Sequence, residues 1–371
     1  MSLKNIRPII LLLVMAILVS GCTVSTNSSG EASSDQGGSV FLSTDAGGTW
    51  KAMTSMPTTN ARVQTINDLN VKMMAMDPSD SRAVYLASFD RGLYYTYNIG
   101  NGWNHVSGLP AGTINDVAVD PKNKCVIYAS LANRLYRSDD CSRRWTQIYF
   151  DNNEAVTVNT IAIDHYNTRN LYIGTSRGEI IKSIDSGSTW RTIQRLEEGF
   201  SRLVISPLDS RFIFAATVKN RIFSFISTTN TNAANSADLE QNFLVDDWTD
   251  MNDVLKDFDL GTNFKELVVT HYGSIFLATD KAILRSPDSG ITWENIKLLP
   301  SEKDAVINAL AVDKQNPDNL YYVTNTTFFG SSDGGATWST KKLPNSRAGR
   351  ELLVDFNNPR NIYMGTVKLK D

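Results

Sequence analysis

Histidine is scarce in this sequence, which contains only His105, His165 and His271. The three form no HExxH motif and no other spacing that would bring several metal ligands together. The sequence also lacks a Gly-x-Ser-x-Gly nucleophile elbow and a glycine-rich phosphate loop. These common signatures of enzymes are therefore excluded, and we predict no metal and no cofactor. We expect His165 and His271 on the surface, because both fall in turns between expected strands.

An excess of charge of one sign is also missing, since 36 basic and 39 acidic residues give a formal net charge of −3. This balance argues against a general polyanion binder, so we predict no nucleic-acid partner. The arginines are nevertheless uneven, with eleven of nineteen between Arg134 and Arg221. That part of the chain forms either a basic flank for an anionic partner or an ordinary solvated surface.

Long apolar runs are absent too, because the most marked one, residues 9–19, has only eleven residues. It follows the basic residues Lys4 and Arg7 and is too short to span a bilayer, so residues 1–21 fit an export signal. Outside this signal no stretch has helical periodicity. The hydrophobic content of 42% is still sufficient for a packed core.

The export signal ends in Val-Ser-Gly followed by Cys22, which resembles a bacterial lipobox. The resemblance implies cleavage before Cys22 and lipid on its thiol and amine, which would anchor the protein to the extracytoplasmic side of a membrane. With Thr23 next, a Gram-negative cell would sort it to the outer membrane. The alternative is an ordinary secreted protein with an incidental Cys22. Residues 22–38 read as the lipidated cysteine and a disordered polar tether.

Seven tryptophans organise the rest of the chain, at spacings of 53, 42, 45, 58, 45 and 45 residues. A period in the forties is typical of a repeat architecture. Six of them end an eight-residue segment that we call the Trp turn. The six segments are Ser43–Trp50, Thr96–Trp103, Ser138–Trp145, Ser183–Trp190, Ser286–Trp293 and Ser331–Trp338. Trp248 has lost the segment.

Each Trp turn lies between two strand-like runs, which predicts a hairpin. Glycine supplies a positive φ there, and the third residue accepts hydrogen bonds from turn amides. The tryptophan ring then packs between adjacent units, which stabilises the fold by roughly 1.5–3 kcal/mol. We therefore expect structural rather than catalytic roles for the acidic or amide residue of each turn. These residues are Asp45, Asn98, Asp140, Asp185, Asp288 and Asp333.

The segment resembles the Asp-box or BNR repeat, Ser-x-Asp-x-Gly-x-Thr-Trp. Members of that family are β-propellers, among them sialidases, xyloglucanases, sortilin-type receptors and photosystem II assembly factors, some of whose bacterial members are lipoproteins. The resemblance covers the chain from about Ser39 onward and implies a propeller over 39–371. It is specific for the fold and says little about activity.

Counting the repeats predicts how the ring closes. Six units are complete, and each contains four antiparallel strands: 71–106, 114–149, 158–193, 200–251, 264–297 and 307–342. The remaining stretches, 39–53 and 350–367, each supply the half that the other lacks. Joining them gives an all-β, seven-bladed propeller closed by a split blade of two plus two strands, with no inter-blade edge left unpaired.

Two features belong to single blades. The fourth blade carries an insertion, residues 228–246, which we interpret as a surface loop. Cys125 opens the second strand of the second blade and Cys141 lies in its Trp turn, at the same end of neighbouring strands. Outside the cytoplasm the pair could form a disulfide or remain two thiols, and the sequence leaves both open.

The residues that enter the innermost strands would ring one mouth of the central channel. We predict a binding surface there, together with loops 54–70, 194–200, 252–263 and 298–306, although a solvated mouth without a ligand is an equal alternative. The candidate residues are Lys72, Asn115, Asp116, Asn159, Arg202, Lys265, Glu266, Asn308, Arg350 and Glu351.

The preferred function is a membrane-anchored, monomeric scaffold that binds another protein or assists complex assembly. The alternatives are a glycan-active enzyme at the cell surface and a carbohydrate-binding propeller. Sialidases of the family use an arginine triad that cannot be aligned here, and xyloglucanases place one acid on each of two rings. Asp116 or Glu266 with Glu351 could supply two carboxylates across the mouth.

Overall fold

The computed structural model describes residues 37–58, 64–227, 245–299 and 306–369. The predicted export signal, Cys22 and most of the tether lie outside these residues, as do residues 228–244 of the predicted insertion 228–246. The last two residues of that insertion belong to a strand instead. The chain from residue 34 onward forms one compact unit. Within the described ranges, no helix is long and apolar enough to cross a membrane.

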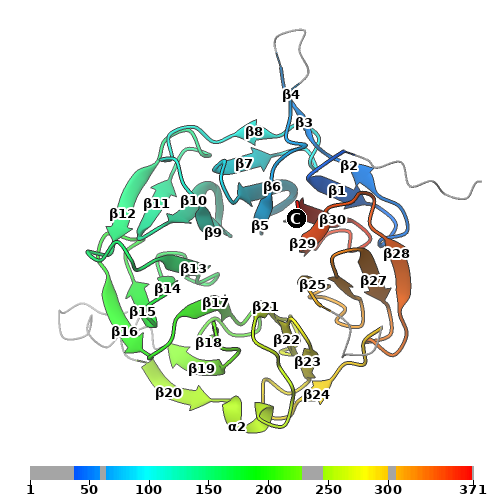
Figure 1. The fold of residues 1–371 in the computed structure, drawn as a ribbon. Helices are drawn as coiled ribbons and strands as arrows, with labels where there is room; N and C mark the ends of the chain where they lie inside the picture. Colours follow the sequence, from blue (N-terminus) through cyan, green and yellow to red (C-terminus); the bar gives the residue numbers. More distant parts are fainter. Residues whose placement is uncertain (1–36, 59–63, 228–244, 300–305, 370–371) are drawn as a thin grey trace, which may run out of the picture. The chain divides into compact units, whose positions relative to one another are not determined.

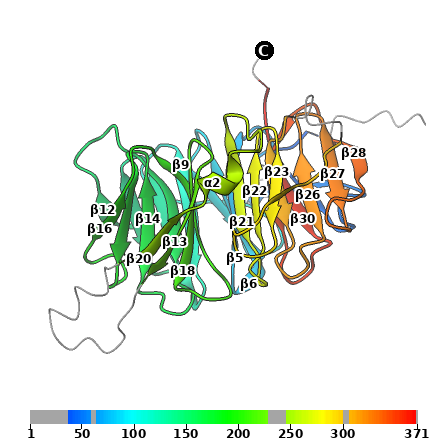
Figure 2. The same ribbon diagram turned by 90° about the horizontal axis from the view of Figure 1, so that it is seen from below.

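Seven four-stranded antiparallel sheets, the blades, form a ring around a central axis (Figure 1). The strands run along the thickness of the disc (Figure 2). From innermost to outermost strand, blade 1 is β5 Val71–Asp77, β6 Asp80–Ser88, β7 Leu93–Thr96, β8 Asn104–His105; blade 2 is β9 Ile114–Asp120, β10 Asn123–Leu131, β11 Arg134–Ser138, β12 Thr146–Phe150; blade 3 is β13 Val158–Ile163, β14 Leu171–Thr175, β15 Glu179–Ser183, β16 Arg191–Arg195; blade 4 is β17 Phe200–Ile205, β18 Phe212–Thr217, β19 Ile222–Ser227, β20 Val245–Asp250. Blade 5 is β21 Phe264–Val269, β22 Ile275–Thr279, β23 Ile283–Ser286, β24 Glu294–Asn295; blade 6 is β25 Ala309–Val312, β26 Leu320–Val323, β27 Thr327–Ser331, β28 Ser339–Lys342; blade 7 is β29 Ala348–Val354, β30 Ile362–Val367, β1 Val40–Ser43, β2 Lys51–Ala52.

The split blade is confirmed. Strand β1 pairs antiparallel with β30, with Phe41 opposite Met364 and Leu42 opposite Tyr363. The main-chain N–H of Thr366 donates to the carbonyl of Ser39 at 2.8 Å, which extends the pairing beyond β1. Blade 7 is therefore built from both described ends of the chain, as the repeat count predicts.

Buried apolar side chains form seven clusters, one between each pair of adjacent blades. The cluster between blades 7 and 1 contains Val40 and Tyr363 from the split blade and Val84 and Trp103 from blade 1. Because each blade buries a face against both neighbours, apolar burial of roughly 25 cal/mol per Å² stabilises the closed ring at every interface. An open array would leave two such faces in water.

The Trp turns have one repeated geometry. In Ser43–Trp50, both oxygens of Asp45 accept hydrogen bonds from Thr49, at 2.8 Å from its N–H and 2.8 Å from its hydroxyl. The hydroxyl of Ser43 donates to Asp45 at 2.7 Å and accepts the N–H of Gly47 at 2.8 Å. The turns of Asp185, Asp288 and Asp333 repeat these bonds. The carboxylates are occupied by the turn itself, which fits the structural role.

Two consecutive residues of each turn, and not only the glycine, adopt positive φ. Gly47 has φ 91°, as the sequence predicts, but Ala46 before it has φ 59°. Left-handed backbone at a residue with a Cβ is strained, so the hydrogen bonds of Asp45 must hold it. In the worn turn of blade 2, Ser142 takes the glycine position with φ 69°, and the side chain of Arg144 donates to Asp140 at 2.9 Å in place of the threonine hydroxyl.

In the other worn turn, a hydrogen bond runs from the main-chain N–H of Asn98 to the hydroxyl of Thr96 at 3.2 Å. The structure also joins Cys125 and Cys141 in a disulfide, which ties the start of β10 to the turn between β11 and β12. The N–H of Cys141 donates to the carbonyl of Cys125 at 3.1 Å. The turn without a glycine is thus also the turn with a covalent tie.

Two of the expected loops contain secondary structure. Loop 54–70 holds a hairpin of β3 Ser55–Met56 and β4 Gln64–Thr65, and loop 252–263 begins with a single helical turn, α2 Asn252–Leu255. The helix buries Leu255 against the cluster between blades 4 and 5. A four-residue turn with a single buried apolar side chain is too short to give a helical pattern in the sequence.

Candidate functional site

The predicted channel-mouth residues occupy one repeated feature of the innermost strands, a β-bulge. In blade 1, Val71 pairs with Ser88 and Met73 with Ala87, so Lys72 between them has no partner in the ladder. The same register shift in the described strands leaves out Asn115, Asn159, Ser201, Lys265 and Arg350. In blade 6, Asn308 directly precedes β25, and its N–H donates to the carbonyl of Val323 at 2.8 Å. We call these seven residues the bulge ring.

A bulge bends its strand and redirects the side chain of the extra residue, and it is over-represented next to functional sites. Here the bulges lie at the end of the channel where the innermost strands begin, which we call the start face. The opposite face carries the Trp turns and is called the turn face. The sequence predicts the positions of the ring from the repeat, but the bulges have no sequence signal of their own.

Several amides of the bulge ring connect neighbouring blades. Lys72 Nζ donates to Asn115 Oδ1 at 2.6 Å, and Asn115 Nδ2 donates to the carbonyl of Val158 in blade 3 at 3.0 Å. Asn159 Nδ2 donates in turn to the carbonyl of Phe200 in blade 4 at 2.9 Å. Asn308 Nδ2 stays within its own blade, donating to Asn325 at 2.8 Å. Asn115 and Asn159 therefore brace the ring.

The residues that follow the bulges bring four ionisable groups together inside the channel. Arg202 lies between two carboxylates, 3.3 Å from Glu266 and 3.8 Å from Asp116. Glu266 raises the pKa of Arg202, although burial opposes this. Asp116 also accepts the N–H of Val117 at 2.9 Å and that of Ile161 at 2.8 Å. Its two oxygens are thus occupied, and blades 2, 4 and 5 are tied together by ionic contacts.

Glu351 completes this group from blade 7. Burial, and secondly the charge of Glu266, raise the pKa of Glu351 to about 8. The side chain is therefore protonated at neutral pH and adds a hydrogen-bond donor rather than a negative charge. Asp116 also has a raised pKa, because of burial. Of the carboxylates the sequence proposes as a catalytic pair, Glu351 has the protonation state of a general acid, whereas Glu266 is paired with Arg202.

On one side of the mouth, most of the bulge-ring residues are cations. Burial lowers the pKa of Lys72 to about 8, and the charge of Arg350 lowers it further while Asp116 opposes the shift. Burial and Arg350 also lower the pKa of Lys265. The guanidinium of Arg350 lies over the ring of Phe89, 5.8 Å from its centroid, and its Nε is buried without a hydrogen-bond partner.

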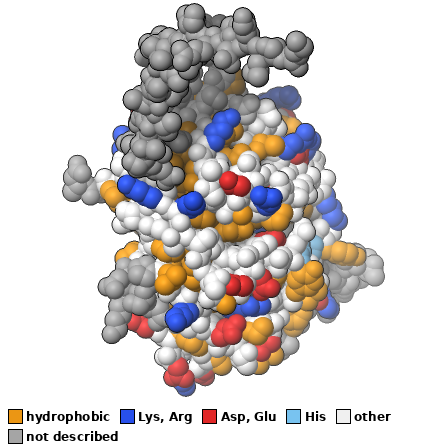
Figure 3. Space-filling view, turned by 90° about the vertical axis from the view of Figure 1, so that its right-hand side faces the viewer, with side chains coloured by type: hydrophobic (Ala, Val, Ile, Leu, Met, Phe, Trp, Pro, Cys, Tyr) orange, Lys and Arg blue, Asp and Glu red, His pale blue; other side chains and the backbone are white. Residues whose placement is uncertain are grey.

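The uneven arginines do not form a free basic flank. Of the eleven between Arg134 and Arg221, all in the described chain, at least seven lie within ion-pair distance of a carboxylate. Arg177, for example, bridges Asp151 at 2.9 Å and Glu179 at 2.5 Å. The side of the molecule that faces away from the blades with these arginines, on the right of Figure 1, also shows basic, acidic and apolar side chains interspersed (Figure 3). The solvated-surface interpretation therefore fits better than the basic flank.

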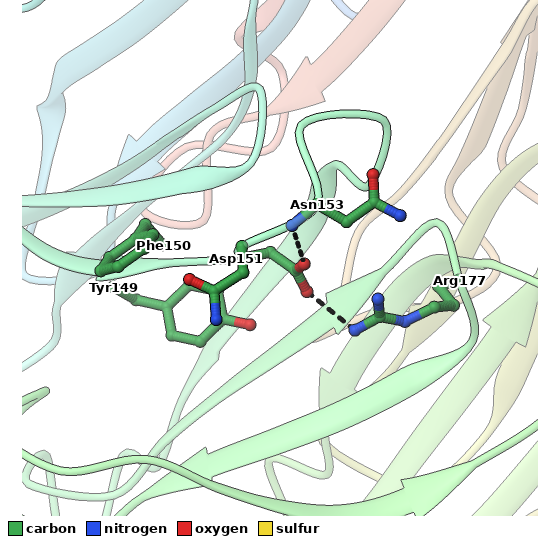
Figure 4. Close-up of a pocket in the computed structure, with 6 residues that line it drawn as sticks. Tyr149, Phe150, Asp151, Asn153 and Arg177 are labelled. Carbon is green, nitrogen blue, oxygen red and sulfur yellow. Dashed lines mark hydrogen bonds and ion pairs between the residues drawn. The ribbon is translucent and has the colours of Figure 1, made fainter.

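A hollow of about 400 Å³ on the start face escaped the sequence analysis (Figure 4). It lies between blades 2 and 3, where Asp151 accepts the N–H of Asn153 at 2.8 Å and pairs with Arg177. Its lining residues are Tyr149, Phe150, Asp151, Asn152, Asn153 and Arg177. The loop after β12 lacks any motif, so only the exposed aromatic end of that strand could have indicated it.

A second hollow, of about 390 Å³, lies on the turn face between blades 3 and 4 and includes His165, Tyr166 and Leu208. His165 and His271 are exposed, as predicted from their turns. Among the described residues, no three His, Cys, Asp or Glu side chains gather in a group that could hold a metal ion.

No protein-family model matches the chain. The chain is 23% identical over 347 residues to the xyloglucanase Xgh74A of Acetivibrio thermocellus, a match that covers 79% of this chain and 36% of the relative. It thus spans about a third of the length of that curated relative. The structure resembles a GH74 xyloglucanase from Xanthomonas campestris, with a TM-score of 0.63, 14% identity, and coverage of 81% of this chain and 51% of the other.

The structure also resembles YCF48 solved with a bound D1 peptide, with a TM-score of 0.58 and 16% identity. That similarity covers 85% of this chain and 96% of the YCF48 chain. YCF48 from Cyanidioschyzon merolae gives a TM-score of 0.56 at 10% identity. The chain shares a fold with these proteins. It is a seven-bladed β-propeller.

Proposed function

We propose that this propeller is a binding protein whose start face docks another protein, held at the extracytoplasmic side of a membrane by lipid on Cys22. Its role would be that of a scaffold in the assembly of a complex. The observation that carries the proposal is the bulge ring, in which one polar side chain from each of the seven blades lies at one mouth. Cations and amides dominate this ring, whereas the carboxylates behind it are engaged with Arg202 or protonated.

The comparison with YCF48 supports a binding role. The similarity extends over most of both chains, and that protein was solved with a peptide bound. The asymmetry of the present ring fits a docking surface as well. Blades 2, 3 and 4 are braced by Asn115, Asn159 and Arg202. In contrast, the bulge-ring cations of blades 5 and 7, Lys265 and Arg350, have no carboxylate within ion-pair distance in the described chain.

A photo-crosslinking residue at Asn308 tests the proposal, with the same residue at Ser210 on the turn face as the matched control. Both variants are incubated with a membrane extract. The Asn308 variant is expected to yield one dominant protein adduct that the Ser210 variant does not give. Equal adducts at the two positions, or recovery of polysaccharide instead of protein, would contradict docking at the start face.

A glycan-active enzyme is the second candidate, because Glu351 is protonated at neutral pH close to the carboxylate of Glu266 and because the xyloglucanase Xgh74A matches most of this chain. In this case Glu351→Gln and Glu266→Gln should each abolish turnover on a panel of soluble glycans. A scaffold would show no turnover in the wild-type protein and no change in its crosslinking to the partner in either variant.

A further inference from the structure

Three cations share one side of the start face. Lys265, Arg350 and Lys72 are bulge-ring residues of blades 5, 7 and 1, and Asn308 of blade 6 lies between the first two in the order around the ring. In the described chain, no carboxylate oxygen lies within 4.0 Å of any of the three. Arg202, only one layer further along the channel, has two carboxylates beside it.

The three charges also influence one another. Besides the larger effect of burial, the guanidinium of Arg350 lowers the pKa of both Lys72 and Lys265, while Asp116 and Asp280 oppose these shifts from beyond ion-pair distance. Arg350 is therefore close enough to repel both lysines. Holding like charges together in a partly buried place is unfavourable, and such sites are enriched where a protein uses the charge.

Hydrogen-bond donors remain available at the same place. Lys72 Nζ has three N–H groups, and the recorded bond to Asn115 uses one. Arg350 Nε is buried and has no acceptor. A buried donor without a partner is unfavourable, and a ligand oxygen at this position would satisfy it. Glu351, on the same strand as Arg350, adds no negative charge at neutral pH, because burial raises its pKa to about 8.

We propose that Lys72, Lys265 and Arg350 form an oxyanion site that accepts a phosphate-sized dianion, either free or as a phosphoryl group on a larger molecule. The planar guanidinium presents parallel donors to two oxygens of the anion, and the two ammonium groups hold it as point charges. This site deepens the proposed function, since it gives the ligand chemistry of the start face, and it rests on that face being a binding surface.

Calorimetric titration of the purified protein in chloride-free buffer tests this proposal. Sulfate serves as a probe because its charge is constant over the working pH range, and inorganic phosphate and glycerol 3-phosphate serve as second and third probes. Sulfate should bind to the wild-type protein, and Arg350→Gln and Lys265→Gln should each weaken its binding by about 10-fold or more. Arg82→Gln on the turn face is the matched control and should bind as the wild type does.

The two phosphate probes distinguish the sources of the anion. Tighter binding of inorganic phosphate points to the free ion, and tighter binding of glycerol 3-phosphate points to a phosphoryl group on a larger molecule. Absence of binding by all three probes, or an equal loss in the Arg82→Gln variant, would overturn the site. Folding is checked separately by the melting temperature, which should rise in Arg350→Gln because repulsion is relieved. Since no partner protein is present, failure here is distinct from failure of the crosslinking experiment.

Discussion

Arg347 is expected to hold the ring closed. It lies just before β29 and is only 8% exposed. Its guanidinium donates from Nε to the hydroxyl of Thr366 at 2.9 Å, and from one terminal nitrogen to the carbonyl of Thr366 at 3.3 Å, the amide oxygen of Asn70 at 3.1 Å and the carbonyl of Leu69. One side chain thus connects the closing strand β30 with the segment that enters blade 1.

Replacing Arg347 with methionine keeps most of the aliphatic volume and removes every donor. Each buried acceptor left without a partner costs about 1–3 kcal/mol, but removing a buried cation returns part of this. Burial lowers the pKa of Arg347, so the buried cation is itself unfavourable. We therefore expect Arg347→Met to reduce the free energy of unfolding by about 2–4 kcal/mol.

Guanidinium chloride unfolding, followed by tryptophan fluorescence, measures this loss. Arg82→Met is the matched control, because Arg82 is 64% exposed and its main partner is the neighbouring Asp80. Exposed pairs of this kind contribute little, so the control should unfold close to the wild-type protein. If Arg347→Met unfolds at the same denaturant concentration as Arg82→Met, the argument that this side chain closes the ring is wrong.

Three further predictions concern the disulfide, acid stability and the channel. The disulfide between Cys125 and Cys141 closes a loop with a sequence separation of 16. Cys125→Ser should therefore lower the free energy of unfolding by about 3 kcal/mol under oxidising conditions, and should differ little from the wild type once a reductant is added. An equal loss in both conditions would point to packing of the side chain instead. Hydrogen bonds within the turns, mainly from Thr49 and Thr337, lower the pKa of Asp45 and Asp333 to about 2. Because these pKa values lie below those of the unfolded chain, the two carboxylates stabilise the fold above about pH 4, and this stabilisation is lost as the pH falls toward about 2. The melting temperature of the double variant Asp45→Asn, Asp333→Asn should therefore be lower at neutral pH but depend less on acid. In the folded protein the pKa of Glu351 is raised to about 8, so folding at any pH between the unfolded pKa and about 8 requires this side chain to take up a proton. Glu351→Gln removes that requirement and should melt at a higher temperature than the wild type at about pH 8, but not at about pH 5. A difference in melting temperature that is the same at both pH values would refute the protonated state.

The repeat carried most of the fold information in the sequence. Tryptophan spacing fixed the number of blades, and the two incomplete halves at 39–53 and 350–367 predicted the pairing of β1 with β30. These features are local, since a turn requires particular residues at particular positions wherever the blade sits. Positions in the mouth could be predicted for the same reason, by counting along each innermost strand to its bulge.

Contacts between blades were not predictable in the same way. Lys182 follows two isoleucines in β15 and would be expected to face solvent, yet it is fully buried, and its Nζ donates to Ser227 of blade 4 at 2.9 Å. The pairing of Arg202 with Glu266 and Asp116 similarly joins residues from three blades. No spacing in the sequence encodes which side chains meet across an interface, because that depends on the rotation between blades.

Strands β1 and β30 also determine when the molecule can finish folding. Ser43 is made early and its partner Ile362 about 320 residues later, which at roughly 5–20 residues per second is roughly 15–60 s of synthesis. During that interval β1 can pair with β2 along one edge, but its other edge lacks β30. The nascent chain must therefore keep this edge of β1 from pairing with other strands until β30 has been synthesised.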